Sequence, residues 1–295
     1  MGILVSHKNQ VTYLEYAKVI KADERVGYIQ ENSGTQYTFA LPYGNMAVLL
    51  LGPGTSITQA AMHHLCAEGC LIGFTGGGGF PIFCGGLSEY RPTEYAQSWL
   101  THWQSEAWRL EVARLFQRVR VELVNKQWGR YGLSKKTRDA VAGAGVALLA
   151  AQKGATTKEA LLGFEAVYAK SLYKALSEEF DVPFKREPRI KGDYANELID
   201  AHNYYAYGIA GAALWALGIP FSFPVLHGDT RRGALVFDVA DMFKDGILLP
   251  LAFISQKEQR DKGGHRKECA KWLNLENALT LVFNEIQNAL AIPTS

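Results

Sequence analysis

The pattern of apolar and polar positions changes near residue 90. Before that point, short runs rich in β-branched and aromatic residues, such as VTYLEYAKVI, RVGYIQEN and TQYTFALP, are separated by turn-forming residues. Runs of this kind predict strands. One short helix is expected among them, within residues 56–68. The first part of the chain is therefore predicted to be a small β domain.

After Pro92 the apolar positions follow helical spacing. Trp99, Trp103 and Ala107 recur at intervals of four within a run that extends to Trp128. Such spacing predicts an amphipathic helix. Further helices are predicted over residues 158–180, 193–217 and 270–291. The second part of the chain is therefore predicted to be mainly helical.

Length and composition fit this division. The chain has 295 residues, 48% of them hydrophobic, which is enough for one large core or two smaller ones. We predict an α+β, multidomain protein with a β-rich domain over residues 1–90 and a predominantly α-helical domain over residues 91–295. No apolar run of about 18 residues is present, so we expect no membrane partner. Four cysteines without a C-x-x-C pair favour the cytoplasm and give no support for a zinc finger.

The net charge of +2 hides local excesses of basic residues. Residues 91–138 contain ten Lys or Arg and four Glu, and residues 257–271 contain six basic and three acidic residues. A shorter basic loop around Pro188 consists of Lys185, Arg186, Arg189 and Lys191. Each segment can follow nucleic-acid phosphates, and each can equally be a solvated face or loop.

The segment FPVLHGDTRRGALVFDVADMFK places His227, Asp238 and Asp241 in otherwise apolar sequence. A buried carboxylate needs a cation, hydrogen-bond donors or solvent. If a helix begins near Asp238, the spacing of three residues places both aspartates on one face. Two interpretations stay open. Asp238 can be the N-cap and Asp241 a first-turn residue, or both can belong to a functional site.

Polar residues also lie on the apolar faces of two predicted helices. In KEALLGFEAVYAKSLYKAL, helical steps from Leu161 pass through Glu165 to Leu172, so Glu165 faces inward. A buried glutamate is usually paired, and a structural ion pair with an arginine is one explanation for it. In the helix over residues 193–217, Asn196 and Tyr207 lie on one stripe in the same way.

Glu165, His227 and Asp241 together form a candidate site with two carboxylate ligands and one nitrogen ligand. This mixture suits Mg²⁺ or Mn²⁺, and the histidine favours Mn²⁺. A non-haem iron site is the rival interpretation, but it usually needs two histidines. The histidines that could still supply a second nitrogen include His63, His64 and His202.

Four blocks of the chain resemble the CRISPR-associated protein one family, the integrase and nuclease of spacer acquisition. YLEYAKVIKADERVGYI is similar to the opening strands of the family, and GFEAVYAKSLYKAL to its glutamate helix. KREPRIKGDYANELIDAHNYYAYG resembles its basic loop and asparagine. LHGDTRRGALVFDVADMFK is the most specific block, because a histidine, two aspartates and a terminal lysine recur in order. Glycines 76–79 depart from the family and are interpreted as a hairpin tip.

The resemblance implies an N-terminal β-sandwich domain that forms a homodimer, followed by a helical catalytic domain. It implies that Glu165, His227 and Asp241 are metal ligands and that Asp238 is an adjacent functional carboxylate. Lys244 would face substrate phosphate. The residues expected at the DNA are Lys185, Arg186, Arg189, Lys191, Asn196 and Tyr207.

The function implied is that of a metal-dependent DNA endonuclease and integrase, with one Mg²⁺ or Mn²⁺ per active site. It would insert short duplexes into a CRISPR array by attack of a 3′-hydroxyl on a phosphodiester, together with the second protein of the adaptation complex. Its substrates would be double-stranded and branched DNA. Two alternatives remain: a structure-selective nuclease without a role in integration, and a nucleic-acid-binding scaffold whose carboxylates are only structural.

Overall fold

A computed structural model describes residues 8, 10–32, 34–75, 81–85, 93–188, 192–228 and 233–294. Within these ranges the strands precede residue 86, and all helices except the short 3-10 turn Tyr43–Asn45 and the first α-helix follow residue 93. The predicted change from strands to helices is therefore confirmed. The predicted domain boundary between residues 90 and 91 lies outside the described residues and stays a prediction.

The first sheet has the order β1-β5-β7-β8. Its strands are β1 (Gln10–Leu14), β5 (Met46–Leu51), β7 (Leu71–Thr75) and β8 (Pro81–Gly85). The first three run parallel, and β8 is antiparallel to β7. Every residue of β5, MAVLLL, is buried. A continuous apolar run is what a strand covered on both faces requires.

The second sheet has the order β4-β3-β2-β6. Its strands are β2 (Ala17–Ala22), β3 (Arg25–Asn32), β4 (Thr35–Ala40) and β6 (Ser56–Ile57). Helix α1 (Gln59–Ala67) confirms the short helix expected within residues 56–68, and Thr58 caps it by accepting from the Ala61 N–H. Both sheets and α1 contribute to one apolar cluster. The β-sandwich arrangement of the two sheets stays a prediction.

The remaining helices are α2 (Glu94–Trp103), α3 (Glu106–Gln127), α4 (Lys135–Gln152), α5 (Lys158–Phe180), α6 (Tyr194–Ala216), α7 (Ala234–Ile247), α8 (Leu249–Lys257), α9 (Lys262–Leu275) and α10 (Ala278–Leu290). Two segments that the apolar spacing predicted as continuous helices are each divided into two helices. The run to Trp128 restarts at Ser105, whose side chain caps α3 at the Trp108 N–H. The run over 270–291 breaks at Asn277, which adopts a left-handed conformation with φ 48°.

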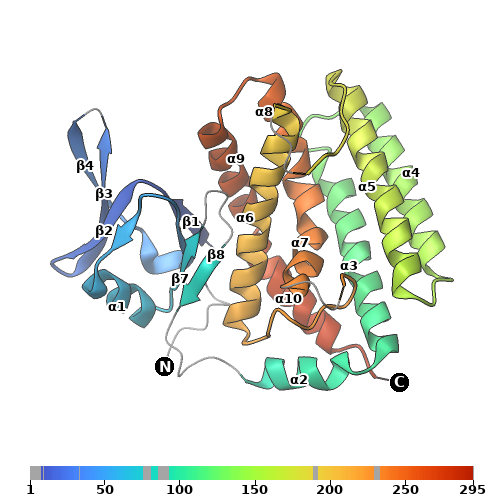
Figure 1. Cartoon of the computed structure of the whole chain (residues 1–295), viewed down its shortest axis with the longest axis horizontal. Coiled ribbons are helices and arrows are strands. Elements are labelled where there is room, and N and C mark those ends of the chain that lie inside the picture. Colours follow the sequence, from blue (N-terminus) through green and yellow to red (C-terminus); the bar gives the residue numbers. More distant parts are fainter. Residues whose placement is uncertain are drawn as a thin grey trace.

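Helices α6, α7 and α3 lie side by side in the middle of the molecule, and the α4–α5 pair lies beyond α3 at the far edge from the sheets (Figure 1). Helix α7 packs closely on α3. Gly246 allows this approach, because a Cβ there would lie 2.8 Å from Leu123 Cβ. Trp128 joins the same two helices by donating to the Asp245 carbonyl at 3.0 Å. This contact places two of the central helices around the candidate site.

The first sheet is joined to the helices by a shared core. Val48 and Leu50 of β5 belong to the same buried cluster as residues of α3, α6 and α7. At the edge of the sheet, Asn274 of α9 accepts from the Val11 N–H at 3.0 Å and donates to the Val11 carbonyl at 3.2 Å. The predicted β-rich and helical parts therefore pack against each other through a continuous apolar interface. None of the described helices is long and apolar enough to cross a membrane.

Candidate metal centre

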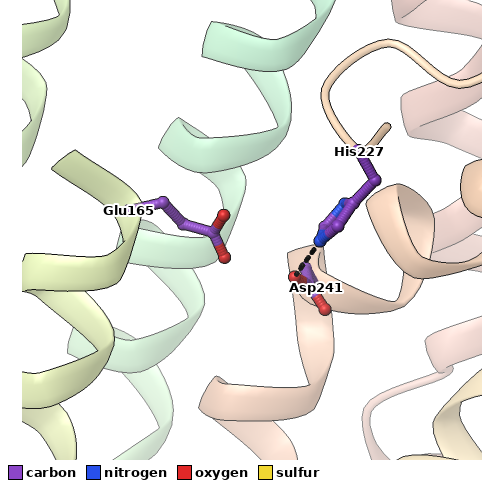
Figure 2. Close-up of side chains that lie close together, drawn as sticks. All are labelled: Glu165, His227 and Asp241. Carbon is purple, nitrogen blue, oxygen red and sulfur yellow. Dashed lines mark ion pairs between the residues drawn. The ribbon is translucent and has the colours of Figure 1, made fainter. Parts of the chain in front are cut away.

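Three side chains from separate segments meet between α5, α3 and α7. Glu165 comes from α5, Asp241 from α7, and His227 from the loop that precedes α7. Each offers one ligand atom, and these atoms lie within 4.8 Å of one another. His227 Nε2 is 3.9 Å from Asp241 Oδ2. Figure 2 shows the Glu165 carboxylate extending from α5 toward the other two side chains. The structure thus brings together the three residues that the sequence suggested as metal ligands.

The capping interpretation of the two aspartates is wrong. Helix α7 begins at Ala234, after Gly233 in a left-handed conformation with φ 68°, so Asp238 lies inside the helix. Its carboxylate instead accepts hydrogen bonds from the backbone N–H groups of Val225, Leu226 and His227 at 2.8, 3.2 and 2.9 Å. Asp238 therefore binds the loop that carries the histidine, and Asp241 lies in the second turn of the helix.

Asp238 also orients the imidazole ring of His227. The distance from His227 Nδ1 to Asp238 Oδ1 is 2.6 Å. With the proton held on Nδ1, the lone pair of Nε2 is presented to the other ligands, an arrangement typical of metal-bound histidines. Burial opposes a charge on the ring, but the hydrogen bond that the ring donates to Asp238 and the charges of Asp241 and Asp238 together raise the pKa of His227.

Asp241 is buried and lies against Lys244, one turn further along α7. The ammonium group of Lys244 forms an ion pair with Asp241 Oδ1. Burial raises the pKa of the carboxyl, whereas the charges of Lys244 and Arg120 lower it by more, so that the pKa of Asp241 is lowered overall. Asp241 is therefore ionised and offers a carboxylate oxygen within 4.8 Å of the ligand atoms of Glu165 and His227.

Glu165 pairs with Arg120 of α3, whose Nη1 lies 2.8 Å from Glu165 Oε1. The ion pair with an arginine, one explanation of the inward glutamate, is thus confirmed, and the same residue belongs to the cluster. Burial is the largest influence and, with the nearby charge of Asp241, raises the pKa of Glu165 in spite of Arg120.

The donor set fits a hard divalent cation. Two carboxylates and an imidazole nitrogen suit Mn²⁺ or Mg²⁺, and their ligand atoms converge within 4.8 Å. A small cavity beside His227 and Asp241 is also lined by Gln117 and Phe116. Within the part of the chain that the structure describes, this ligand group contains a single histidine. The two-histidine pattern of the iron alternative is therefore not found among those residues.

The predicted DNA-contacting loop is anchored to the start of α6. Lys185 is exposed, and its Nζ lies 2.9 Å from Glu187 Oε1. Arg186 donates to Asn196 Oδ1 at 2.8 Å and forms an ion pair with Asp200 at 2.5 Å. Asn196 is buried, and its amide also donates to the Lys185 carbonyl. Asn196 and Arg186 thus hold the loop in shape. Arg189 and Lys191 lie outside the described residues.

Tyr207 and Lys244 lie together near the candidate metal ligands. Lys244 Nζ is 5.9 Å from the centre of the Tyr207 ring, which packs edge to face on Phe237 with centroids 4.6 Å apart. The charge of Asp241 raises the pKa of Lys244 in spite of burial, so the ammonium stays protonated. This places one positive charge beside the ligand group. The roles of both residues toward DNA stay predictions.

Two residues of this centre were missed by sequence reasoning. Arg120 and Asp245 are both buried, and Arg120 Nε donates to Asp245 Oδ2 at 2.7 Å. The spacing of four between Asp241 and Asp245 was a usable signal, because such residues share a helix face. Arg120, which lies between Val119 and Val121 in the long predicted helix, was a second one.

Comparison with known proteins adds an independent finding. Residues 13–286 match the family described as CRISPR associated protein Cas1. The CRISPR-associated endonuclease Cas1 of Pectobacterium atrosepticum is 38% identical over 97% of this chain and 93% of its own length. A solved structure of TtCas1 with DNA is similar with a TM-score of 0.71 at 24% identity, covering 96% of this chain and 92% of that chain. A chain of a partial Cas6-RT-Cas1–Cas2 complex is similar with a TM-score of 0.63 at 14% identity, covering 96% and 95%.

Proposed function

The chain belongs to the family of CRISPR associated protein Cas1, and from this premise we propose that it is a divalent-metal-dependent DNA endonuclease and integrase. The observation that carries the proposal is the convergence of Glu165, His227 and Asp241 within 4.8 Å. Similarity to the Cas1 endonuclease of Pectobacterium atrosepticum over 97% of the chain supports the reaction class. The reaction is attack of a 3′-hydroxyl, or of water, on a DNA phosphodiester.

Each residue of the centre has a distinct task in this proposal. A bound cation would withdraw charge from the scissile phosphate and lower the pKa of the attacking group. Glu165, Asp241 and His227 Nε2 would hold one Mg²⁺ or Mn²⁺, and Asp238 keeps the His227 proton on Nδ1. Lys244, partly buried beside Asp241, supplies a fixed positive charge that suits a phosphate oxygen.

We predict that His227→Ala and Asp241→Ala abolish cleavage and strand transfer while leaving the fold intact. Each change removes one ligand without opening a large apolar cavity. The measurement is Mn²⁺-dependent cleavage of branched DNA, with circular dichroism as the check of folding. His63→Ala, a change of an exposed histidine in α1, is the matched control and should cleave like the wild type. Cleavage by either ligand variant at the wild-type rate would contradict the proposed site.

The same assays separate the remaining alternatives. A scaffold with structural carboxylates would show no metal-dependent turnover, and a nuclease without an integration role would cleave but not join DNA. Transfer of a duplex with 3′-hydroxyl ends into array DNA, in the presence of the second adaptation protein, is the decisive reaction. The similarity to a chain of a Cas1–Cas2 complex supports including that partner.

We also propose that the chain forms a homodimer through its β-rich part, because joining both ends of one duplex needs two active sites. Phe39 and Tyr37 of β4 remain 42% and 48% exposed. Phe39 stacks on Tyr28, which packs against the apolar cluster under the sheet, with centroids 5.1 Å apart. The apolar face thus continues onto an uncovered strand, which is typical of an interaction surface.

Sedimentation at micromolar concentration tests the dimer. Tyr37→Lys combined with Phe39→Lys should shift the protein toward monomer, because two like charges would be buried in the interface. Val146→Lys, at an exposed position of α4, is the control and should sediment like the wild type. A wild-type protein that is only monomeric would overturn this assignment.

A further inference from the structure

We propose that Arg120 is a positioning residue: it holds the Glu165 carboxylate in place for the cation, and Asp245 holds Arg120. The inference deepens the proposed function, since it rests on the metal site of Glu165, His227 and Asp241. It adds a second layer to that site, a buried chain of charged side chains that links three helices.

Arg120 is held in place by its contacts with two carboxylates, and we call this residue the brace of Glu165. The side chain is 2% exposed, and its guanidinium lies 5.5 Å from the centre of the Tyr168 ring. Nε donates to Asp245 Oδ2 at 2.7 Å, and Nη1 donates to Glu165 Oε1 at 2.8 Å. Gln117 Oε1 accepts a further, longer bond of 3.3 Å. A planar guanidinium held at two edges has little freedom to rotate.

The arrangement of the helices explains why Glu165 needs such a brace. Helix α3 lies between α5 and α7, so the ligand on α5 must extend past α3 to reach the ligands near α7 (Figures 1 and 2). Arg120 is the α3 side chain that the Glu165 carboxylate meets on this path. A long glutamate side chain loses rotamer freedom when it binds a cation. Arg120 restricts the rotamers of Glu165 before the cation binds.

The contact between Arg120 and Glu165 leaves one carboxylate oxygen of Glu165 available to bind a cation. Arg120 donates to Oε1 of Glu165, so the second oxygen of the carboxylate can turn to a cation. Asp245 lies four residues after Asp241, so α7 presents a ligand and the acceptor for the brace on one face. Asp245 also balances the charge of Arg120, so that the guanidinium does not have to draw Glu165 away from the site.

The experiment removes Arg120 and Asp245 together, so that neither of these two residues is left as a buried charge without the other. In Arg120→Met combined with Asp245→Leu, both partners are replaced by apolar side chains, a change that buried ion pairs often tolerate. We expect the double variant to fold and to bind Mn²⁺ about 10- to 100-fold more weakly, as loss of supporting contacts to metal ligands typically does. Binding is measured without DNA, from the electron paramagnetic resonance signal of unbound Mn²⁺.

A matched control tests whether any lost ion pair has this effect. Arg130 and Glu276 form an ion pair between the region after α3 and the end of α9. Arg130→Met combined with Glu276→Gln should bind Mn²⁺ like the wild type. Equal weakening in both double variants would overturn the inference, because it would mark a general effect on stability.

Arg120→Lys keeps the charge but can pair well with only one carboxylate, so it serves as a second variant if the double variant does not fold. It should also bind Mn²⁺ more weakly, and excess Mn²⁺ should restore its cleavage activity, whereas Glu165→Ala should not be restored. Wild-type Mn²⁺ affinity in folded Arg120→Lys or in the folded double variant would overturn the positioning role. A wild-type protein that binds no Mn²⁺ would overturn the proposed metal site, and the inference with it.

Discussion

Asp238 is the residue on which the local geometry of the candidate metal site depends most directly. One carboxylate accepts three backbone N–H groups of the loop and the ring of His227. The same group therefore fixes the loop, the ring orientation and the tautomer of the histidine. Asp238, for which the sequence left both a helix cap and a functional site open, thus has a structural and a chemical task at once.

We predict that Asp238→Asn weakens Mn²⁺ binding by about 10- to 100-fold, because the amide no longer secures the proton on His227 Nδ1. The change also leaves buried N–H donors short of an acceptor, which should lower the free energy of unfolding by about 1–3 kcal/mol. Mn²⁺ titration and urea unfolding measure the two effects. Asp139→Asn, at the exposed Lys135–Asp139 pair, should change neither quantity. Unaltered Mn²⁺ affinity in Asp238→Asn would disprove the orienting role.

At the scale of elements, α6 and α9 are packed through a pair of buried histidines. His202 of α6 and His265 of α9 have ring centroids 5.8 Å apart. Ser255 lies within hydrogen-bond distance of His265 Nδ1 at 3.0 Å, and His202 Nδ1 has no hydrogen-bond partner. Burial lowers the pKa of His265 to about 4 and holds the pKa of His202 well below its usual value.

These lowered pKa values predict acid sensitivity. The unfolded chain takes up protons on both histidines below about pH 6.5, whereas the folded chain does not, so stability falls as the pH decreases from about 6.5 toward 4. Between pH 7 and pH 5, His202 alone should account for up to about 2 kcal/mol of this loss. His202→Phe should therefore show a smaller loss in urea unfolding over that interval. His63→Phe, at an exposed site, should lose as much as the wild type, and equal losses in all three proteins would contradict the prediction.

At the scale of the whole molecule, the described residues combine two four-stranded sheets, a group of packed helices and a buried cluster of charged side chains. The apolar cluster runs from β5 through α6 and α7 to α3, so the first sheet and the helices around the candidate site share their packing. The basic residues considered for DNA contact lie in three separate segments of the chain. Which segment follows the DNA backbone is therefore a question about the whole surface.

Measuring how DNA affinity depends on salt concentration shows which basic segment follows the DNA backbone. Phosphate contacts release counterions, with a log–log slope of about −0.9 per contact on duplex DNA. Lys185, Arg189 and Lys191 should be changed together to Gln, with Arg186 kept because it holds Asn196 and Asp200. We expect weaker binding to all DNA sequences and a shallower slope, since backbone contacts do not read bases.

Two comparison variants complete this measurement. Lys135→Gln with Lys136→Gln tests the segment 91–138, and Lys267→Gln with Lys271→Gln tests the segment 257–271. An unchanged slope in the triple variant, together with a shallower slope in either pair, would move the DNA path to that other segment.

The sequence by itself determined the features that depend on local periodicity and residue type. Helix α5 occupies the predicted residues 158–180, and α6 lies within one residue of the predicted range at each end, because an apolar stripe at helical spacing specifies a helix without distant partners. The inward direction of Glu165 follows from the same stripe. The family resemblance was also readable from the order of polar residues along the chain.

Only the tertiary structure decided the features that depend on partners distant along the chain. Asp238 became the acceptor for a loop more than ten residues away, and Arg120 meets an aspartate that follows it by 125 residues. The start of α7 and the break at Asn277 coincide with residues in a left-handed conformation, Gly233 and Asn277, which the apolar spacing does not mark. The physical reason is that a buried charge is stable only where folding supplies its partner, and spacing along one helix does not specify which segment comes to lie beside it.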